Sequence, residues 1–545
     1  MVLTKLEVAK KLDKTDKASI LSVLGELEAA GEGPAEALGY AEPVSKFLLS
    51  NDAEIAAAAA SALGSMGSVG KAYIPLISSL LTNDSAGVRV AAVQALGGFG
   101  GFAKELSGKI ASLASDDPEA FVKATAIDVL GSLRADDQTD VLVKSLKNNS
   151  TEVAGAACEA LALLGSLTEA QLMDKLSSAA TFSYAVTAAA SLGKKAPVAC
   201  LDAVVTKGIA SEDGMVRSAA VTVVGNLAEA ALMEPTLGKL KACAKSSSAG
   251  VRAAAMLAFA GMGPKAPRQL DFMSELLLDE DEDTASLAAV IGGGSRRPAA
   301  QTRKPKCAAI YAIGKMKATY YLPQIDDALN DANWEVRLCA IETAMSFGKP
   351  AKMLSGKIAD MLSDDAYPVR EKAALALGCL KAVDSAEDLV AAFKDGSHSV
   401  RSAALTALSM LMPAACKYSP KVFKLTNDKV APVRAAAIRC LSMMGATGMN
   451  YASVIAPMLN DEDPEVRVEA CEALARMGEF GAAFYDDLTE HMYEKAPQVA
   501  SAAKKAVAVL SGSAPKAGSI GKPTTFKTYN PAAALAAERA KMGLK

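Results

Sequence analysis

Histidine is the side chain that most often transfers protons near neutral pH, and it is the commonest metal ligand. This chain of 545 residues has two histidines. His398 stands in the segment KDGSHSVR, and His491 follows Glu490 in LTEHMYE. A metal site needs three or four converging ligands. Two histidines in separate segments do not supply such a set, so we interpret both as surface residues.

Cysteines are the other candidate nucleophiles and metal ligands. None of the nine forms a CxxC pair, and most fall in segments with helical periodicity. We expect reduced, buried thiols. The acidic run at 279–283 lacks EF-hand spacing, and GSIGKPT at 518–524 lacks the upstream Gly and the Ser or Thr of a Walker A loop. We therefore predict a protein that is not an enzyme and has no cofactor.

Composition narrows the class of protein. Hydrophobic residues make up 51% of the chain but aromatic residues only 5%, which favours helices rich in Ala and Leu. The net charge of −3, from 58 basic and 61 acidic residues, argues against nucleic-acid binding. The first residues lack the features of a secretory or transit signal, and no apolar run is long enough for membrane insertion. We expect a cytoplasmic protein.

One phrase recurs along the chain: an acidic or Asn-Asp turn, a Val-Arg pair, and an Ala-rich segment that ends near Gly. The clearest copy is NDEDPEVRVEACEALARMG at 460–478. Using the Val position as an anchor, most neighbouring copies are 31 to 35 residues apart. Longer intervals hide one degenerate copy near Thr181 and another that ends at 308–317. The total is about fourteen repeats, with anchors at Ile55, Val88, Val122, Val153, Val216, Val251, Val336, Val369, Val400, Val433, Val466 and Val499.

Each repeat has the pattern of two helices joined by a turn. Small or apolar residues recur at about +3, +4, +7, +8 and +11 from the anchor, which is one face of an α-helix. The acid in the turn stands where an N-cap belongs, and Gly at +12 suits the C-terminal end. Neither helix can bury its apolar face alone, so neighbouring repeats must stack. The predicted fold class is an all-α solenoid.

This phrase resembles the HEAT-repeat family, and its 33-residue length is similar to the short HEAT-like repeats of the phycobilisome-lyase type. The resemblance covers about residues 41–512. It implies that second helices line a concave face and that Asp and Arg of successive repeats form a buried ladder. Carried onto this sequence, the ladder consists of Arg89, Arg217, Arg252, Arg337, Arg370, Arg401, Arg434 and Arg467, with Asp84, Asp213, Asp331, Asp395, Asp428 and Asp461 as partners.

Three segments depart from the repeat. Residues 1–40 are predicted to form a looser helical cap. Residues 279–306 are rich in Gly, Pro and mixed charge, so we expect an exposed loop, either without a task or used for docking through Arg296 and Arg297. Residues 513–545 form a basic, extended tail with a short terminal helix from Pro531. Its candidate contact residues are Lys522, Phe526, Lys527 and Tyr529.

The +6 position of each second helix marks a possible binding surface. Acids outnumber bases at this position: the charged residues are Asp128, Glu159, Glu342, Glu472, Arg439 and Lys505. We take the first five as candidate partner-binding residues, and the excess of acids favours a basic peptide or helix. The alternative is a plain solvated face.

The main functional hypothesis is a non-enzymatic scaffold or adaptor for other proteins, with cytoskeletal or ciliary components among the possible partners by analogy. The alternatives are a lyase-like or enzyme-associated factor and, ranked last, a transport receptor for peptide cargo. No residue pattern identifies the partner.

Overall fold

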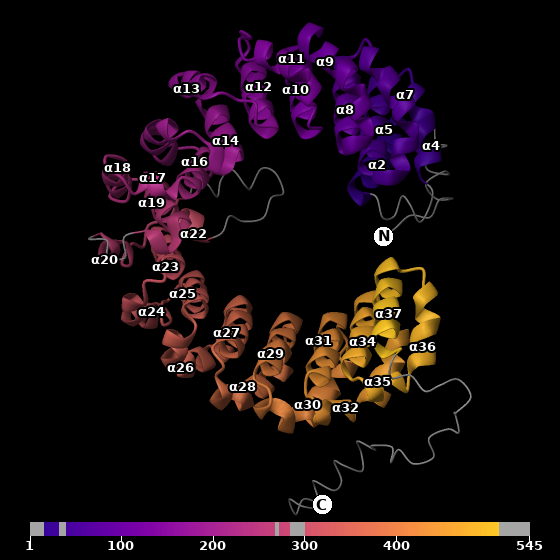
Figure 1. Cartoon of the computed structure of the whole chain (residues 1–545), viewed down its shortest axis with the longest axis vertical. Coiled ribbons are helices and arrows are strands. Elements are labelled where there is room, and N and C mark those ends of the chain that lie inside the picture. Colours follow the sequence, from indigo (N-terminus) through magenta and orange to yellow (C-terminus); the bar gives the residue numbers. More distant parts are fainter. Residues whose placement is uncertain (1–15, 32–39, 267–271, 284–299, 512–545) are drawn as a thin grey trace, which may run out of the picture. The chain divides into compact units, whose positions relative to one another are not determined.

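The computed structural model describes residues 16–31, 40–266, 272–283 and 300–511. Every regular element within these ranges is a helix, and short first helices alternate with longer second helices (Figure 1). The prediction of an all-α solenoid of HEAT-like repeats is confirmed. The number of about fourteen repeats stays a prediction. The calls on Arg296, Arg297 and residues 513–545 lie outside the described residues, and the predicted cap contributes one described helix, α2 (Lys17–Ala30).

The chain divides into two compact units, residues 1–266 with 283–297 and residues 267–282 with 298–545. The second helices of the first unit, after α2, are α5 (Ala53–Ser65), α8 (Ala86–Gly98), α10 (Ala120–Ser132), α12 (Thr151–Leu164), α14 (Phe182–Leu192), α16 (Gly214–Asn226) and α19 (Ala249–Met262). Those of the second unit are α23 (Pro305–Lys315), α25 (Trp334–Phe347), α27 (Tyr367–Cys379), α29 (His398–Met410), α31 (Ala431–Ser442), α34 (Pro464–Arg476) and α37 (Pro497–Leu510).

The first helices are shorter and often continue into a 3-10 turn. In the first unit they include α4 (Ala41–Ser45), α7 (Ile74–Ser79), α9 (Ser107–Asp116), α11 (Thr139–Ser145), α13 (Glu169–Ser177), α15 (Leu201–Ala203) and α18 (Thr236–Cys243). In the second unit they include α20 (Met273–Leu276), α24 (Leu322–Ala328), α26 (Ser355–Asp360), α28 (Ala386–Ala391), α30 (Ser419–Lys424), α33 (Ala452–Ile455) and α36 (Tyr485–Glu490).

The repeat around α34 shows why the phrase folds as it does. The side chain of Asp463 caps the helix by accepting a hydrogen bond from the Glu465 amide. Val466 and Leu474 are fully buried on the predicted face. At the other end Gly478 has φ of 56°, a left-handed conformation that Gly adopts without a steric penalty. The turn, the apolar face and the terminal Gly therefore have the positions that the sequence predicts.

Small residues allow second helices of neighbouring repeats to approach closely. A Cβ atom built on Gly64 would lie 2.6 Å from Cα of Ala95, and one built on Gly378 would lie 2.7 Å from Cα of Ala407. In both pairs the Gly is nine residues after its anchor and the Ala seven residues after the next anchor. This backbone contact explains why Ala and Gly, rather than larger apolar residues, dominate the second helices.

Candidate functional site

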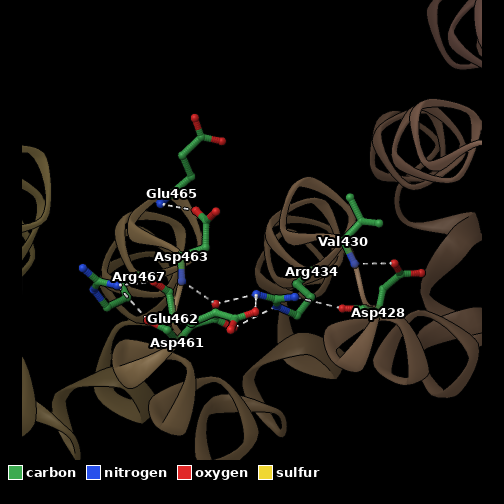
Figure 2. A network of polar contacts seen from close by, with 8 residues as sticks. All are labelled: Asp428, Val430, Arg434, Asp461, Glu462, Asp463, Glu465 and Arg467. Carbon is green, nitrogen blue, oxygen red and sulfur yellow. Dashed lines mark hydrogen bonds and ion pairs between the residues drawn. The ribbon is translucent and has the colours of Figure 1, made fainter. Parts of the chain in front are cut away.

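The Arg residues after the anchors join each repeat to the next one. Arg401 donates from Nε and Nη2 to the carboxylate of Asp428, at 2.9 and 2.8 Å. Its Nη1 donates to the main-chain carbonyl of Asp395, in its own turn, at 2.9 Å. Arg434 repeats this arrangement with the Asp461 carboxylate and the Asp428 carbonyl (Figure 2). Such bidentate, charge-assisted contacts fix both the distance and the orientation of successive turns.

In the second unit these contacts continue through six successive junctions. The position that is Arg elsewhere is Lys306 in the first of them, and its Nζ lies 2.6 Å from the Asp331 carboxylate. Sequence reasoning missed Lys306 and two of the acids, Asp364 and Glu494. The six pairs are Lys306–Asp331, Arg337–Asp364, Arg370–Asp395, Arg401–Asp428, Arg434–Asp461 and Arg467–Glu494.

The partner acids need two corrections. Asp84 gives only its main-chain carbonyl to Arg89, whose guanidinium binds the carboxylate of Asp117 instead. Asp213 is the N-cap of α16 and accepts from the Met215 amide. The physical reason is register, because the acid that meets the Arg of the preceding repeat stands six residues before its own repeat's Arg position. Counting six residues back from each Arg position would have found Asp117 and Asp364.

The first unit has fewer such contacts. Besides Arg89, Arg217 binds an acid outside its own repeat, Asp283, and also donates to the carbonyls of Ser211 and Glu212. Arg252 donates to the carbonyls of Ser246 and Ser247. Second helices α10 and α12 carry Lys123 and Ala154 where Arg would stand. The sequence predicted this interruption near Val122 and Val153.

Burial and pairing act in opposite directions on the ladder carboxylates. Burial raises the pKa of Asp428, but hydrogen bonds from Arg401 and from the Val430 amide outweigh it, and the pKa lies below the ordinary value. The pKa values of Asp117, Asp364, Asp395 and Asp461 are lowered in the same way. The ladder acids are therefore charged at neutral pH and serve structure.

The +6 positions form a solvent-reaching row on the second helices. Most other residues of these helices are buried, whereas each member of the row is exposed or half-buried. We call this set the second-helix row. Its members are Ser61, Gln94, Asp128, Glu159 and Thr222, with Leu257, in the first unit, and Glu342, Leu375, Thr406, Arg439, Glu472 and Lys505 in the second.

In the second unit, the candidate binding charges of this row already have partners. Glu342 lies 2.9 Å from the Lys372 Nζ. Arg439 donates to the buried carboxylate of Glu469 at 2.8 Å, which also binds Arg476. Arg476 in turn contacts Glu472 at 2.8 Å. These internal pairs reduce the charge available to a partner, so the excess of acid is not found on this unit's row.

In the first unit, the two row acids have no basic partner among the described residues. Asp128 on α10 and Glu159 on α12 belong to helices that pack against each other. Part of the Asp128 side chain reaches solvent, yet the surrounding protein desolvates it and, with the charge of Glu152, raises its pKa to about 6. Burial and the charge of Asp128 raise the pKa of Glu159 to about 7. A cationic group here would relieve this repulsion.

The prediction of an exposed loop through residue 306 is wrong at its C-terminal end. Residues 300–303 form helix α22, and Arg303 is fully buried between Glu282 and Glu335. Lys304 lies 3.1 Å from Glu335, and Lys306 lies 2.5 Å from Glu280. The acidic and basic ends that suggested a loop therefore neutralise each other. Sequence alone could not show this, because the two ends are separated by residues 284–299.

Side chains suited to catalysis do not converge in the part of the chain that the structure describes. No group of three or more His, Cys, Asp and Glu there could hold a metal ion. Burial raises the pKa of the thiols of Cys158, Cys440 and Cys471 to about 12, so they stay protonated. His491 pairs with Glu494 at 3.0 Å, beside the last ladder contact. Within the described residues, no helix has the length and apolar character needed to cross a bilayer.

Comparisons with known proteins agree with this fold. A model of HEAT repeats matches residues 419–508. The structure is similar to the karyopherin Kap121p bound to the SUMO protease Ulp1p (TM-score 0.57, 12% identity) and to Kap121p bound to Ste12p (TM-score 0.50, 13% identity). Each match covers 93% of this chain but only 62% and 64% of the respective Kap121p chain. No curated protein matches by sequence.

Proposed function

We propose that this HEAT-repeat α-solenoid is a non-enzymatic scaffold that binds partner proteins along its second-helix row. One observation carries the proposal: helices that are otherwise buried expose one side chain per repeat, in phase, through both units. A row of this kind presents many small contacts to an extended partner and has no single active centre. The described residues hold no competing set of catalytic groups.

The partner chemistry that fits best is a basic peptide or helix at α10 and α12. Asp128 and Glu159 repel each other in partly desolvated positions, and a Lys or Arg between them would replace that repulsion with attraction. The acids of the second unit's row contribute less, because Lys372 and Arg476 already pair with Glu342 and Glu472. We place the basic-peptide contact on the first unit.

A charge-reversal experiment tests this contact. The double variant Asp128→Lys/Glu159→Lys should lose most binding of the partner protein, while the chain stays folded because both side chains face solvent. The matched control is Asp140→Lys/Glu169→Lys, which makes the same charge change at exposed residues outside the row. Equal loss in both variants, or no loss in either, would refute a specific contact at α10 and α12.

A transport receptor is the second candidate, and the comparisons raise it from the last rank that the sequence analysis gave it. Both structures cited above show a karyopherin bound to another protein. Crosslinking pull-down from the native cell separates the two functions. A scaffold should yield one or two partners in fixed stoichiometry, whereas a receptor should yield several cargo proteins crosslinked to the same row. Cytoskeletal or ciliary partners, and the tail as a second contact, remain predictions that the same experiment tests.

A further inference from the structure

Two adjoining grooves lie between first helices of the second unit, away from the second-helix row. The larger, about 520 Å³, is lined by α26 and α28 with their following turns. The smaller, about 310 Å³, lies between the end of α24 and α26. Asp360 and Ser363 line both grooves, so the two are continuous. We call them the first-helix groove.

The groove has an acidic excess that the ladder does not neutralise. Asp331, Asp364 and Asp395 also line it, but each pairs with a ladder Lys or Arg. Asp360 and Asp388 are exposed and make no hydrogen bond or ion pair through their side chains within the described residues. Asp360 is the last residue of α26, the end at which a helix dipole favours a cation. Apolar atoms of Ala359, Leu362, Ala391 and Ala392 line the rest.

We propose that the basic C-terminal segment of this same chain docks in the first-helix groove, with Lys527 between Asp360 and Asp388. Charge complementarity supports this occupant. Residues 513–545 carry six basic residues and one acid, Glu538. Phe526 and Tyr529 flank Lys527 in the segment TTFKTYN and match the apolar part of the lining. The proposal is independent of the second-helix row.

The length of the chain decides which lysine can reach the groove. From α27 to α37 there are four helix-to-helix steps (α29, α31, α34 and α37 pack in order), which at 8–10 Å each make roughly 40 Å. Sixteen residues separate Ser511 from Lys527, and an extended chain of that length spans about 53 Å. Lys516 is only five residues from Ser511 and spans about 17 Å, so it cannot reach. Because the segment is tethered, its effective concentration is high and a weak contact suffices.

Zero-length carboxyl–amine crosslinking of the full chain, followed by mass spectrometry, tests the proposal. Lys527 should crosslink to Asp360 or Asp388, and the crosslink should be lost at 1 M salt, where the screening length falls to about 3 Å. It should also be lost in Asp360→Asn/Asp388→Asn. The control Asp327→Asn/Asp384→Asn removes two exposed carboxylates of the same unit outside the groove and should retain the crosslink.

A mixture of isotopically light and heavy chains identifies the source of the segment. Crosslinks within one isotope class support docking inside one chain. Mixed light–heavy crosslinks would show that a second copy supplies the segment, and would overturn the proposal. It would also be overturned if Lys527 crosslinked mainly to other acids, or if no tail lysine crosslinked while a positive-control pair, Lys372 with Glu342, did so. These readouts require no partner protein, so they are separate from the test of the second-helix row.

Discussion

The close contact between Gly378 and Ala407 makes a prediction whose sign is opposite to the usual one. In a helix interior, replacing Gly by Ala normally stabilises by about 1 kcal/mol, because Ala has the higher helix propensity. At Gly378 the new Cβ would lie 2.7 Å from Cα and 3.1 Å from the carbonyl oxygen of Ala407. These are backbone atoms of α29, so the contact can be relieved only by moving one helix away from the other.

The expected magnitude follows from two opposing terms. Overpacking of a close-packed contact costs about 1–3 kcal/mol, and the propensity gain returns about 1 kcal/mol. Gly378→Ala should therefore destabilise the junction of α27 and α29 by up to about 2 kcal/mol, a reduction in exchange protection of up to about 30-fold. Because solenoid repeats interact mainly with their neighbours, the effect should stay local.

Hydrogen exchange followed by mass spectrometry measures this directly. Peptides from α27 and α29 should lose protection in Gly378→Ala, while peptides from α5 and α8 should not change. The control Gly356→Ala lies in α26, where a new Cβ would meet nothing within 4 Å, and it should hold or raise protection. Increased protection at α27 in Gly378→Ala would refute the argument that backbone contact selects Gly here.

Other predictions follow from the charges. Arg401→Met should destabilise the α29–α31 junction by about 3–5 kcal/mol, because it leaves buried Asp428 without its guanidinium; local hydrogen exchange measures it, and Arg476→Met, on a half-exposed Arg, should cost far less. The pKa of Asp428 is lowered in the folded chain, so its stabilisation is complete well above 3.8 and is lost as pH falls through that value toward the folded pKa; acid titration of the same junction should show this, and Asp428→Asn should remove it. The affinity for a basic peptide should rise between pH 5.5 and 7.5 as Asp128 and Glu159 ionise, and calorimetry should find this dependence absent from Asp128→Asn/Glu159→Gln. Arg303→Met should leave Glu282 and Glu335 facing each other and lower the protection of α23 and α25.

The sequence by itself determined the class of fold and the unit of repetition. A phrase recurring about every 33 residues, with an acid before the helix and Gly after it, specifies a helix pair that must stack. This local information is dense, because capping, periodicity and termination lie within one repeat. It also located the exposed +6 positions, since a single helix fixes which of its residues share a face.

Only the tertiary structure decided which charges meet. The acid for Arg89 is Asp117 rather than Asp84, because each Arg reaches forward to the next repeat's turn and the distance depends on how repeats stack. Arg303 looked like part of an exposed basic segment, but the fold buries it between Glu282 and Glu335, which are distant in sequence. The row acids look alike in sequence, yet Glu342 and Glu472 have basic partners and Asp128 and Glu159 do not. Electrostatic energy depends on distance and solvent exposure, and packing between repeats sets both.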